Sequence, residues 1–276
     1  MSTSPVGSAA PGAVVEIRSR SNPTLVRIRR LLRDGTDYRR HGEIWVEGEH
    51  LCAAALDAGW VPHQALVART AWLDGRWSSV LARAPRLAVV DDALHAELSG
   101  LDSPADVGLV LRLPESGSLD PALDAVVLDR LQDPGNVGSI LRTAAALGVR
   151  QVLALKGTVA LWSPKVVRAG MGAHFGLHLV EGLTPAALGP LLGHAVVTGS
   201  HGGPALNRVH LPSPCAWLFG HEGQGVAPEL ASLATLSVRI PQPGGQESLN
   251  VAAAAAICLY EMQRQRASRE PLLEDQ

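Results

Sequence analysis

Three segments in the C-terminal half of the sequence combine several glycines with isolated polar side chains, an arrangement that suits a ligand site. The segments are 128–149, 217–230 and 239–261. In the first, a helix beginning at Asn136 would gather its apolar residues on one face and place Arg142 almost opposite them. Arg142 is therefore either a solvent-exposed arginine without a role or a group that contacts another molecule.

The second segment has three glycines within the six residues 220–225, with Glu222 between them. Glycines clear side chains away, so this pattern indicates either a tight turn or backbone that closely approaches a ligand. In the third segment, Ser248 and Asn250 open a helix of small residues. Backbone N–H groups at such a helix start can bind polar ligand atoms, although either side chain could also serve only as a cap.

Other glycine-rich and catalytic motifs are absent from the sequence. There is no GxxxxGK[ST] phosphate loop, no HExxH metal motif and no GxSxG nucleophile motif. The glycines at 135–138 also lack the GxGxxG spacing of a dinucleotide-binding fold. These absences leave the three segments as the candidate site.

Length and composition describe an ordinary globular protein of one large or two ordinary domains. Of 276 residues, 46% are apolar and 18% are charged, and the net charge is −2. Cys52, Cys215 and Cys258 form no CxxC pair, so we expect buried thiols. No secretory signal is recognisable, and the apolar run 251–260 is too short to cross a bilayer. We expect a cytoplasmic protein with no membrane segment and no metal.

Strand and helix patterns alternate along the chain and predict two α/β regions. We expect a disordered tail over 1–15, a first domain over 16–112, a Pro/Gly/Ser-rich linker over 113–121 and a second domain over 122–276. In the second domain, short connections predict a mostly parallel sheet covered on both faces. Its expected strands are 125–131, 151–155, 195–198, 216–220 and 236–240, and its expected helices are 137–147, 163–172, 228–234 and 248–266.

The first domain opens with an arginine-rich stretch. Between Ile17 and Arg40 there are eight arginines against two aspartates, a local charge of +6. Helical spacing of apolar residues from Leu25 to Leu32 leaves the arginines largely on the other faces. They form either a solvated helix face or an arm that contacts phosphates. The candidate phosphate contacts are Arg18, Arg20, Arg27, Arg29 and Arg30.

In order along the chain, the three glycine-rich segments resemble the signature motifs of the SpoU/TrmH family of RNA 2′-O-methyltransferases. The first holds N-x-G-x-x-x-R-x-A from Asn136, the second G-x-E-G-x-G from Gly220, and the third I-P from Ile240 followed by E-S-L-N-V. The segment RAGMGAHF at 168–175 is also similar to the family, which usually has Ser where Gly170 stands. Three motifs in the same order make the resemblance specific.

The resemblance implies an α/β fold of the SPOUT type, with a mostly parallel sheet and a deep trefoil knot. It also implies a homodimer that binds S-adenosylmethionine and methylates a ribose 2′-hydroxyl of RNA. The phrase EIWVEGEHLCAAAL at 43–56 resembles the small ribosomal-protein-like RNA-binding domain that many members carry, with Trp45 in its aromatic position. Because that domain typifies ribosomal members, we expect large-subunit rRNA as the substrate.

The resemblance assigns the reacting hydroxyl to Arg142. A free arginine does not readily lose its proton, so we expect Arg142 to stabilise the developing alkoxide. Asn136 is expected to hold the first loop or contact the ribose, and Glu222 to orient Arg142 or that loop. Ser248 and Asn250 are expected to make polar contacts near the reacting group. The expected cofactor-binding residues are Leu218, Phe219, Gly220, Glu222, Gly223, Ile240, Gln242, Ser248, Leu249 and Asn250.

Two positions depart from the family pattern. His221 stands where Asn is common, and Gln224 where a basic residue is frequent. We expect both to affect target choice more than activity, and His221 to be structural rather than a general base. Three alternatives stay open: a tRNA methyltransferase of the same family, a non-catalytic RNA-binding or ribosome-assembly factor, and a small-molecule methyltransferase. The arginine-rich stretch and the expected RNA-binding domain argue against the last.

Overall fold

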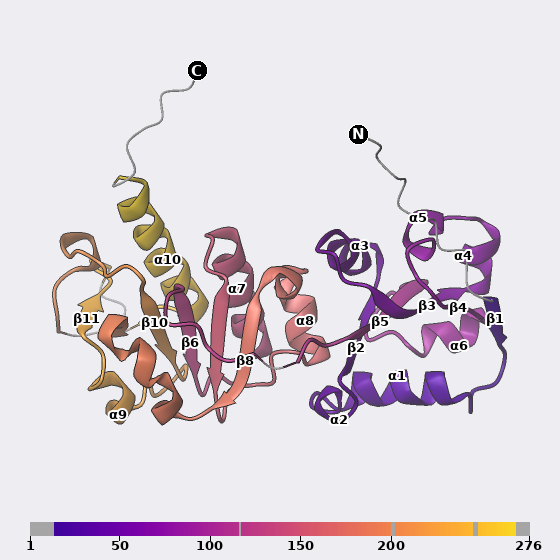
Figure 1. Cartoon of the computed structure of the whole chain (residues 1–276), viewed down its shortest axis with the longest axis horizontal. Coiled ribbons are helices and arrows are strands. Elements are labelled where there is room, and N and C mark those ends of the chain that lie inside the picture. Colours follow the sequence, from indigo (N-terminus) through magenta and orange to yellow (C-terminus); the bar gives the residue numbers. More distant parts are fainter. Residues whose placement is uncertain (1–13, 116, 200–201, 245–247, 269–276) are drawn as a thin grey trace, which may run out of the picture. The chain divides into compact units, whose positions relative to one another are not determined.

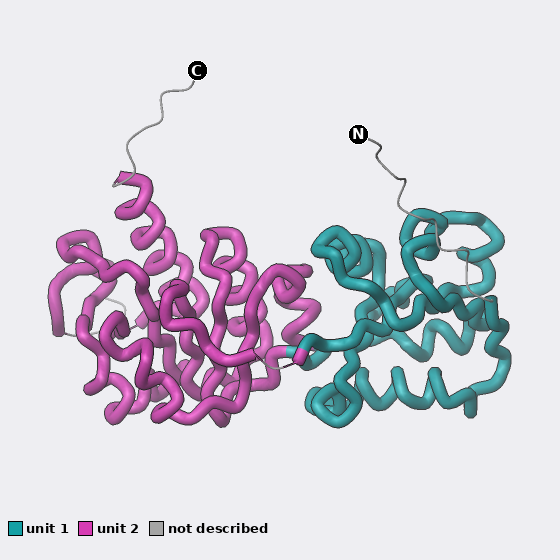
Figure 2. Tube along the Cα trace, viewed as in Figure 1, with its two compact units in different colours: residues 1–114, 162–164 teal, residues 115–161, 165–276 magenta. Residues whose placement is uncertain are grey.

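The protein consists of two compact units. The computed structural model describes residues 14–115, 117–199, 202–244 and 248–268. One unit comprises Met1–Pro114 with Trp162–Pro164, and the other comprises Glu115–Leu161 with Lys165–Gln276 (Figure 2). Each unit is built around its own sheet, coloured from indigo to magenta in the first and from magenta to yellow in the second (Figure 1).

Unit 1 contains a five-stranded mixed sheet with the strand order β1-β4-β3-β5-β2. Strands β1, β4 and β3 pair in parallel, whereas β5 runs antiparallel to both β3 and β2. The strands are β1 (Val14–Ile17), β2 (Glu43–Glu47), β3 (Pro62–Ala68), β4 (Leu87–Val90) and β5 (Val107–Arg112). The helices are α1 (Pro23–Arg33), α2 (Tyr38–His41), α3 (Glu49–Asp57), α4 (Arg69–Leu73), α5 (Ser78–Leu81) and α6 (Asp92–Ala96).

The N-terminal end of unit 1 corrects one expectation. Residues 1–13 of the expected disordered tail lie outside the described residues, but Val14 and Val15 belong to β1, which pairs with β4. Val14 and Val15 form a strand because they pair with β4, which is distant in the sequence, and no local sequence pattern predicts this pairing. The next element is as expected: Asn22 caps α1 by accepting the N–H of Thr24 at 2.9 Å.

Unit 2 contains a six-stranded sheet with the order β11-β9-β10-β6-β7-β8, in which every pairing is parallel. The expected mostly parallel sheet is thereby confirmed. The strands are β6 (Ala125–Asp129), β7 (Gln151–Leu155), β8 (His178–Leu183), β9 (Ala195–Gly199), β10 (Ala216–Gly220) and β11 (Leu236–Arg239). The helices are α7 (Pro134–Ala146), α8 (Pro164–Gly170), η1 (Ala173–Gly176), η2 (Pro185–His194), η3 (Leu206–Arg208), α9 (Pro228–Ala231) and α10 (Val251–Ala267).

Alternate residues of these strands enter two separate cores, one on each face of the sheet. On one face, Val126 and Phe219 pack with the buried sides of α7 and α10, which lie next to each other (Figure 1). On the other face, Val127 and Leu218 pack with η2 and α9. Because both faces are covered, the inner strands β6, β7 and β10 are buried along their whole length rather than at alternate residues.

The strand order creates a reversal at β6. From β6 the chain builds β7 and β8 outward, then returns to form β9, β10 and β11 on the other side of β6. Parallel sheets of this kind bind ligands beyond the carboxyl ends of the strands near such a reversal. The glycine-rich segments follow β6, β10 and β11, so the fold brings all three to this edge.

Several element boundaries differ from the sequence expectation. Helix α7 begins at Pro134, with Asp133 as its cap, so Asn136 lies in the first turn and not before the helix. Strand β8 was not expected as a separate element, because HLVEGL interrupts its apolar residues with Glu181 and Gly182. Helix α10 begins at Val251, and Asn250 is its cap.

The three cysteines are buried and form no disulfide, as expected. Burial raises the pKa of both Cys52 and Cys215 to about 12, so both thiols stay protonated and unreactive at neutral pH. Within the described ranges, no helix is long and apolar enough to span a membrane.

Candidate functional site

Glu222 joins the second glycine-rich segment to the first. Its carboxylate accepts the backbone N–H groups of Gln132 at 3.3 Å and Asp133 at 3.2 Å, and the side-chain amide of Asn136 at 3.2 Å. Asp133 in turn caps α7 by accepting the N–H of Asn136 at 2.7 Å. Of the two expected targets of Glu222, these bonds favour the loop: within the described residues, no hydrogen bond or ion pair joins Glu222 to Arg142.

Asn136 continues the connection to the third segment. Its Oδ1 accepts from Nδ2 of Asn250 at 2.9 Å, and Oδ1 of Asn250 accepts the N–H groups of Ala252 at 2.9 Å and Ala253 at 3.3 Å. An ionised carboxylate only accepts hydrogen bonds and a backbone N–H only donates them. The side-chain amides of Asn136 and Asn250 can therefore each adopt only one orientation. Glu222, Asn136 and Asn250 therefore form a directional hydrogen-bond chain that ends on α10.

This hydrogen-bond chain requires an ionised Glu222. Burial by itself would raise the pKa of Glu222, but hydrogen bonds from its own backbone, from the Asn136 side chain and from the N–H groups of Asp133 and Gln132 outweigh burial and lower the pKa. The carboxylate is consequently charged at neutral pH, in the state that can accept all of these donors.

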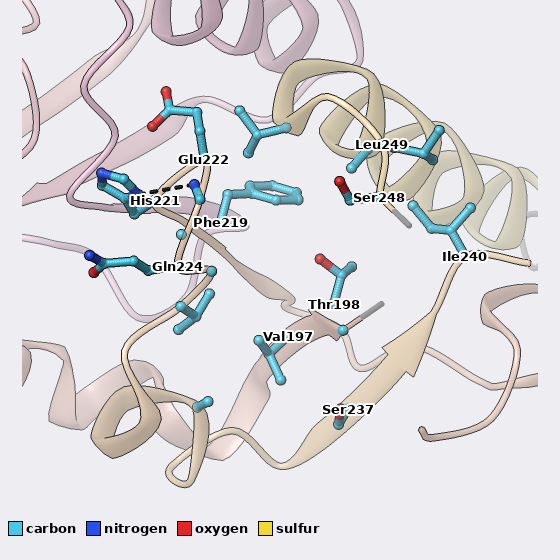
Figure 3. Close-up of a pocket in the computed structure, with 18 of the residues that line it drawn as sticks. Val197, Thr198, Phe219, His221, Glu222, Gln224, Ser237, Ile240, Ser248 and Leu249 are labelled. Atoms are coloured by element: carbon cyan, nitrogen blue, oxygen red, sulfur yellow. Dashed lines mark hydrogen bonds between the residues drawn. The ribbon is translucent and has the colours of Figure 1, made fainter. Parts of the chain in front are cut away.

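A pocket of about 500 Å³ opens beside the hydrogen-bond chain, at the carboxyl ends of β9 and β10. Its walls are the loop 220–226, the end of β9 and the segment that precedes α10 (Figure 3). Thr198, Ser237 and Ser248 contribute polar atoms to the lining. The volume is within the range of small-molecule sites, about 300–1,000 Å³.

Gln242 adds an unused hydrogen-bond acceptor to the pocket. Its Oε1 is buried, and no described residue donates to it. A buried acceptor without a donor costs free energy that a ligand donor would recover. The pocket therefore suits a ligand that carries N–H or O–H groups.

The loop after β10 is a tight turn that needs its glycines. Nδ1 of His221 accepts the N–H of Gly223 at 3.0 Å (Figure 3), and the carbonyl of His221 accepts the N–H of Gly225 at 2.7 Å. A Cβ on Gly220 would lie 2.1 Å from the carbonyl carbon of Gly225, so only glycine allows this return of the chain. These contacts give His221 a role in shaping the turn.

Most of the expected cofactor-binding residues surround the pocket. Those that line it are Phe219, Gly220, Glu222, Gly223, Ile240, Gln242, Ser248 and Leu249. Leu218 and Asn250 do not line it, because Leu218 is buried in the core beneath η2 and α9 and Asn250 is bound to Asn136 and α10. Arg142 lies exposed on α7 outside the lining, and its side chain has no hydrogen-bond or ion-pair partner among the described residues.

Strands β9 and β11 also contribute to the pocket, which was not predicted from the sequence. Val197, Thr198 and Gly199 at the carboxyl end of β9 line the pocket, and so does Ser237 of β11. A glycine directly after a buried strand was the available signal at 199. Gly199 reaches the pocket only because β9 lies next to β10, and no local sequence pattern predicts that these two strands are neighbours.

Four of the five arginines expected to contact RNA are paired with acidic side chains of unit 1. The pairs are Arg18–Glu16 at 2.7 Å, Arg20–Glu97 at 3.0 Å, Arg29–Glu97 at 3.4 Å and Arg27–Glu43 at 3.2 Å. The fifth, Arg30, is exposed and has no such partner in the described part of the chain. The local charge of +6 therefore overstates the positive charge that this stretch presents.

We predict that Glu222→Gln destabilises unit 2 at neutral pH by about 1 kcal/mol. The reason is that the new amide N–H group would face one of the N–H groups that donate to the carboxylate of Glu222. The pKa of Glu222 is lowered from 4.5. Its contribution is therefore present above pH 4.5 and is lost as the pH falls through the lowered pKa. Denaturant unfolding at neutral and acidic pH measures this difference.

The control for this measurement is Glu115→Gln, since Glu115 is exposed and has no hydrogen-bond or ion-pair partner among the described residues. The control should unfold as the wild type does. Equal stability of Glu222→Gln and wild type at neutral pH would contradict the role assigned to the carboxylate.

The architecture of the whole chain has close counterparts among solved structures. The crystal structure of the SpoU methyltransferase AviRb from Streptomyces viridochromogenes in complex with the cofactor AdoMet matches with a TM-score of 0.82 and 27% identity, covering 90% of this chain and 99% of AviRb. The structure of an RNA 2′-O ribose methyltransferase matches with a TM-score of 0.76 and 32% identity, covering 92% of this chain and all of that one.

Sequence comparison agrees with the structural similarity. The model of the SpoU rRNA Methylase family matches residues 125–260. An uncharacterized tRNA/rRNA methyltransferase of Synechocystis is 32% identical over 92% of this chain and 95% of its own length. The 23S rRNA (guanosine(2553)-2'-O)-methyltransferase RlmP of Bacillus subtilis is 30% identical over 79% of this chain and 87% of its own length. The chain therefore belongs to the SpoU rRNA methylase family.

Proposed function

We propose that this protein transfers a methyl group from S-adenosylmethionine to a ribose 2′-hydroxyl of the ribosomal RNA of the large subunit. The observation that carries the proposal is the Glu222–Asn136–Asn250 chain, which joins the three family motifs beside a pocket of ligand size. Relatives named as 23S rRNA 2′-O-methyltransferases, RlmP among them, support the substrate class. Three buried, unpaired cysteines fit action in the reducing cytoplasm.

S-adenosylmethionine, when bound, supplies a methyl group attached to a positively charged sulfur, and the sulfur is the leaving group when a hydroxyl oxygen attacks the methyl carbon. The pocket would hold it through the backbone of the 220–223 turn and of Ile240 and Leu249. Gln242 and Ser248 would provide polar contacts, and the unused acceptor of Gln242 matches the amino and hydroxyl donors of this cofactor. Leu218 supports this wall from the core beneath it.

Arg142 is proposed as the catalytic residue that contacts the reacting hydroxyl. An arginine side chain does not readily act as a base, so Arg142 would stabilise negative charge on the oxygen while the hydroxyl proton passes to a phosphate of the substrate. The Arg142 side chain is exposed and has no partner among the described residues, so its guanidinium is available to bind substrate. Asn136, Glu222 and Asn250 would hold α7, and with it Arg142, in place relative to the pocket.

We expect Arg142→Ala to lower the rate of methyl transfer about 100-fold or more, the usual cost of losing a group that stabilises an oxyanion. Affinity for S-adenosylmethionine should not change, because Arg142 does not line the pocket. Methyl transfer to rRNA and calorimetric cofactor binding measure the two effects. Arg150→Ala is the control, because the Arg150 side chain is also exposed and has no hydrogen-bond or ion-pair partner among the described residues. Retained turnover in Arg142→Ala would remove Arg142 from the mechanism.

We also propose that unit 1 binds RNA and that Arg30 is its most effective phosphate contact among the five arginines of the stretch. An arginine held by a glutamate must give up that partner to bind a phosphate, whereas Arg30 has none to give up among the described residues. Phosphate contacts govern how steeply RNA affinity falls with salt.

The prediction is that Arg30→Ala reduces the slope of log affinity against log salt by about 0.7 to 0.9, the loss of one phosphate contact. The probe is a defined transcript of 23S rRNA, titrated at several salt concentrations. Arg20→Ala, which removes an exposed arginine paired with Glu97, should change the slope less. A larger change in Arg20→Ala than in Arg30→Ala would contradict the assignment.

A homodimer is the proposed assembly. The family resemblance implies it, and α10 exposes Ile257 and Tyr260, which line a shallow apolar hollow together with Leu206 and Pro241. Exposed apolar patches of this kind mark surfaces that bind partners. A protein that is fully active while sedimenting as a monomer would contradict the proposal.

A further inference from the structure

Asp129 and Arg130 form a tight ion pair where β6 ends. Nε of Arg130 donates to one carboxylate oxygen of Asp129 at 2.9 Å, and one Nη donates to the other at 3.0 Å. The Asp129 side chain is only 4% exposed, so its charge depends on this partner. The pair raises the pKa of Arg130, which keeps the guanidinium charged.

The same two side chains hold the loop that forms one wall of the pocket. The other Nη of Arg130 donates to the side-chain oxygen of Gln224 at 3.0 Å, and the guanidinium also reaches the carbonyl of Gly225 at 3.4 Å. The Asp129 carboxylate accepts the N–H of Ala227 at 2.7 Å, directly after the loop. Asp129 and Arg130 thus fix both the tip and the end of this turn.

Figure 3 shows how Gln224 takes part. Its side chain extends from the loop away from Thr198 and Ser248, on the side where His221 also lies. Gln224 contributes to the pocket lining, but its amide oxygen accepts a hydrogen bond from Arg130. The contact therefore acts on the shape of the wall and not on the chemistry inside the pocket.

Arg130 adopts a backbone conformation that non-glycine residues rarely take, with φ at +59°. Neighbouring contacts hold it there: its N–H donates to Oγ1 of Thr158 at 3.0 Å, and Gly157, against which the Arg130 side chain packs, has no side chain of its own. Strained backbone persists where the surroundings determine it, and such residues cluster at ligand sites. A glycine would fit this φ without strain, but it would lack the side chain that bonds Asp129 and Gln224.

We propose that Arg130 is a positioning residue for cofactor binding, which sets the conformation of the loop 221–226 before the cofactor arrives. The inference rests on the proposed function, because it takes S-adenosylmethionine as the ligand of the pocket. A loop held in its bound conformation binds more tightly, since less ordering is left for the ligand to impose. Arg130 itself does not line the pocket.

The test is Arg130→Lys, which keeps a positive charge beside Asp129 and the same backbone strain. One ammonium group cannot bond both carboxylate oxygens and also reach Gln224 and Gly225. We expect the Kd for S-adenosylmethionine, measured by calorimetry on the full chain without RNA, to rise about tenfold. In a Gln224→Ala background the same substitution should have a smaller effect, because the two residues act through one contact.

Arg266→Lys is the matched control. Arg266 also makes a two-pronged pair, with Asp124 at the opposite end of β6, and among the described residues no hydrogen bond or ion pair joins its side chain to the loop. If Arg130 acts through the loop, Arg266→Lys should bind the cofactor within twofold of wild type even where its Tm falls. Equal weakening in the two lysine variants, or unchanged affinity in Arg130→Lys, would overturn the proposal.

Amide hydrogen exchange without cofactor separates this inference from the proposed function. In Arg130→Lys, the N–H of Gly225, which is bonded to the carbonyl of His221, should exchange faster than in wild type, while amides of α7 exchange unchanged. An unchanged rate at Gly225 would show that Arg130 does not hold the loop. Failure of the wild type to bind S-adenosylmethionine would refute the proposed function, and the exchange result would still decide whether Arg130 positions the loop.

Discussion

The site depends on one constraint: two side-chain amides lie between a carboxylate that can only accept and a helix end that can only donate. Glu222 fixes the orientation of Asn136, Asn136 fixes that of Asn250, and Asn250 caps α10. The three residues come from segments that lie far apart in the sequence, so no one segment can adopt the arrangement alone. Changing any one group leaves a donor or an acceptor without its partner, which explains why these motifs occur together.

The parallel sheet makes this meeting possible. Strands β6 and β10 are neighbours whose carboxyl ends lie at the same edge, and β9 extends that edge on the far side of β10. Motif one follows β6, motif two follows β10, and α10 returns across the face that α7 covers. Asp129 and Arg130 then hold the second loop from the end of β6, so the first segment contacts the loop from two directions.

The sequence predicted best what depends on local pattern. The strand 216–220 has the expected bounds, the parallel sheet follows from short strand-to-helix connections, and Asn250 opens the last helix. Prediction failed where distant partners decide. Val14 and Val15 are strand only because β4 lies beside them, and two arginines of α1, Arg27 and Arg29, pair with glutamates from β2 and from the residue after α6. The pocket role of Thr198 required knowing the strand order, and the trefoil knot implied by the family resemblance stays a prediction.

The proposed activity of this chain is the methylation of a ribose 2′-hydroxyl of ribosomal RNA. The most direct measurement maps ribose 2′-O-methylation across all ribosomal and transfer RNAs of the source organism, comparing the parent strain with one that lacks the gene. We expect methylation to disappear at a nucleotide of the large-subunit ribosomal RNA and to return when the wild-type gene is restored. Methylation that is lost only from transfer RNA, or is unchanged everywhere, would contradict it.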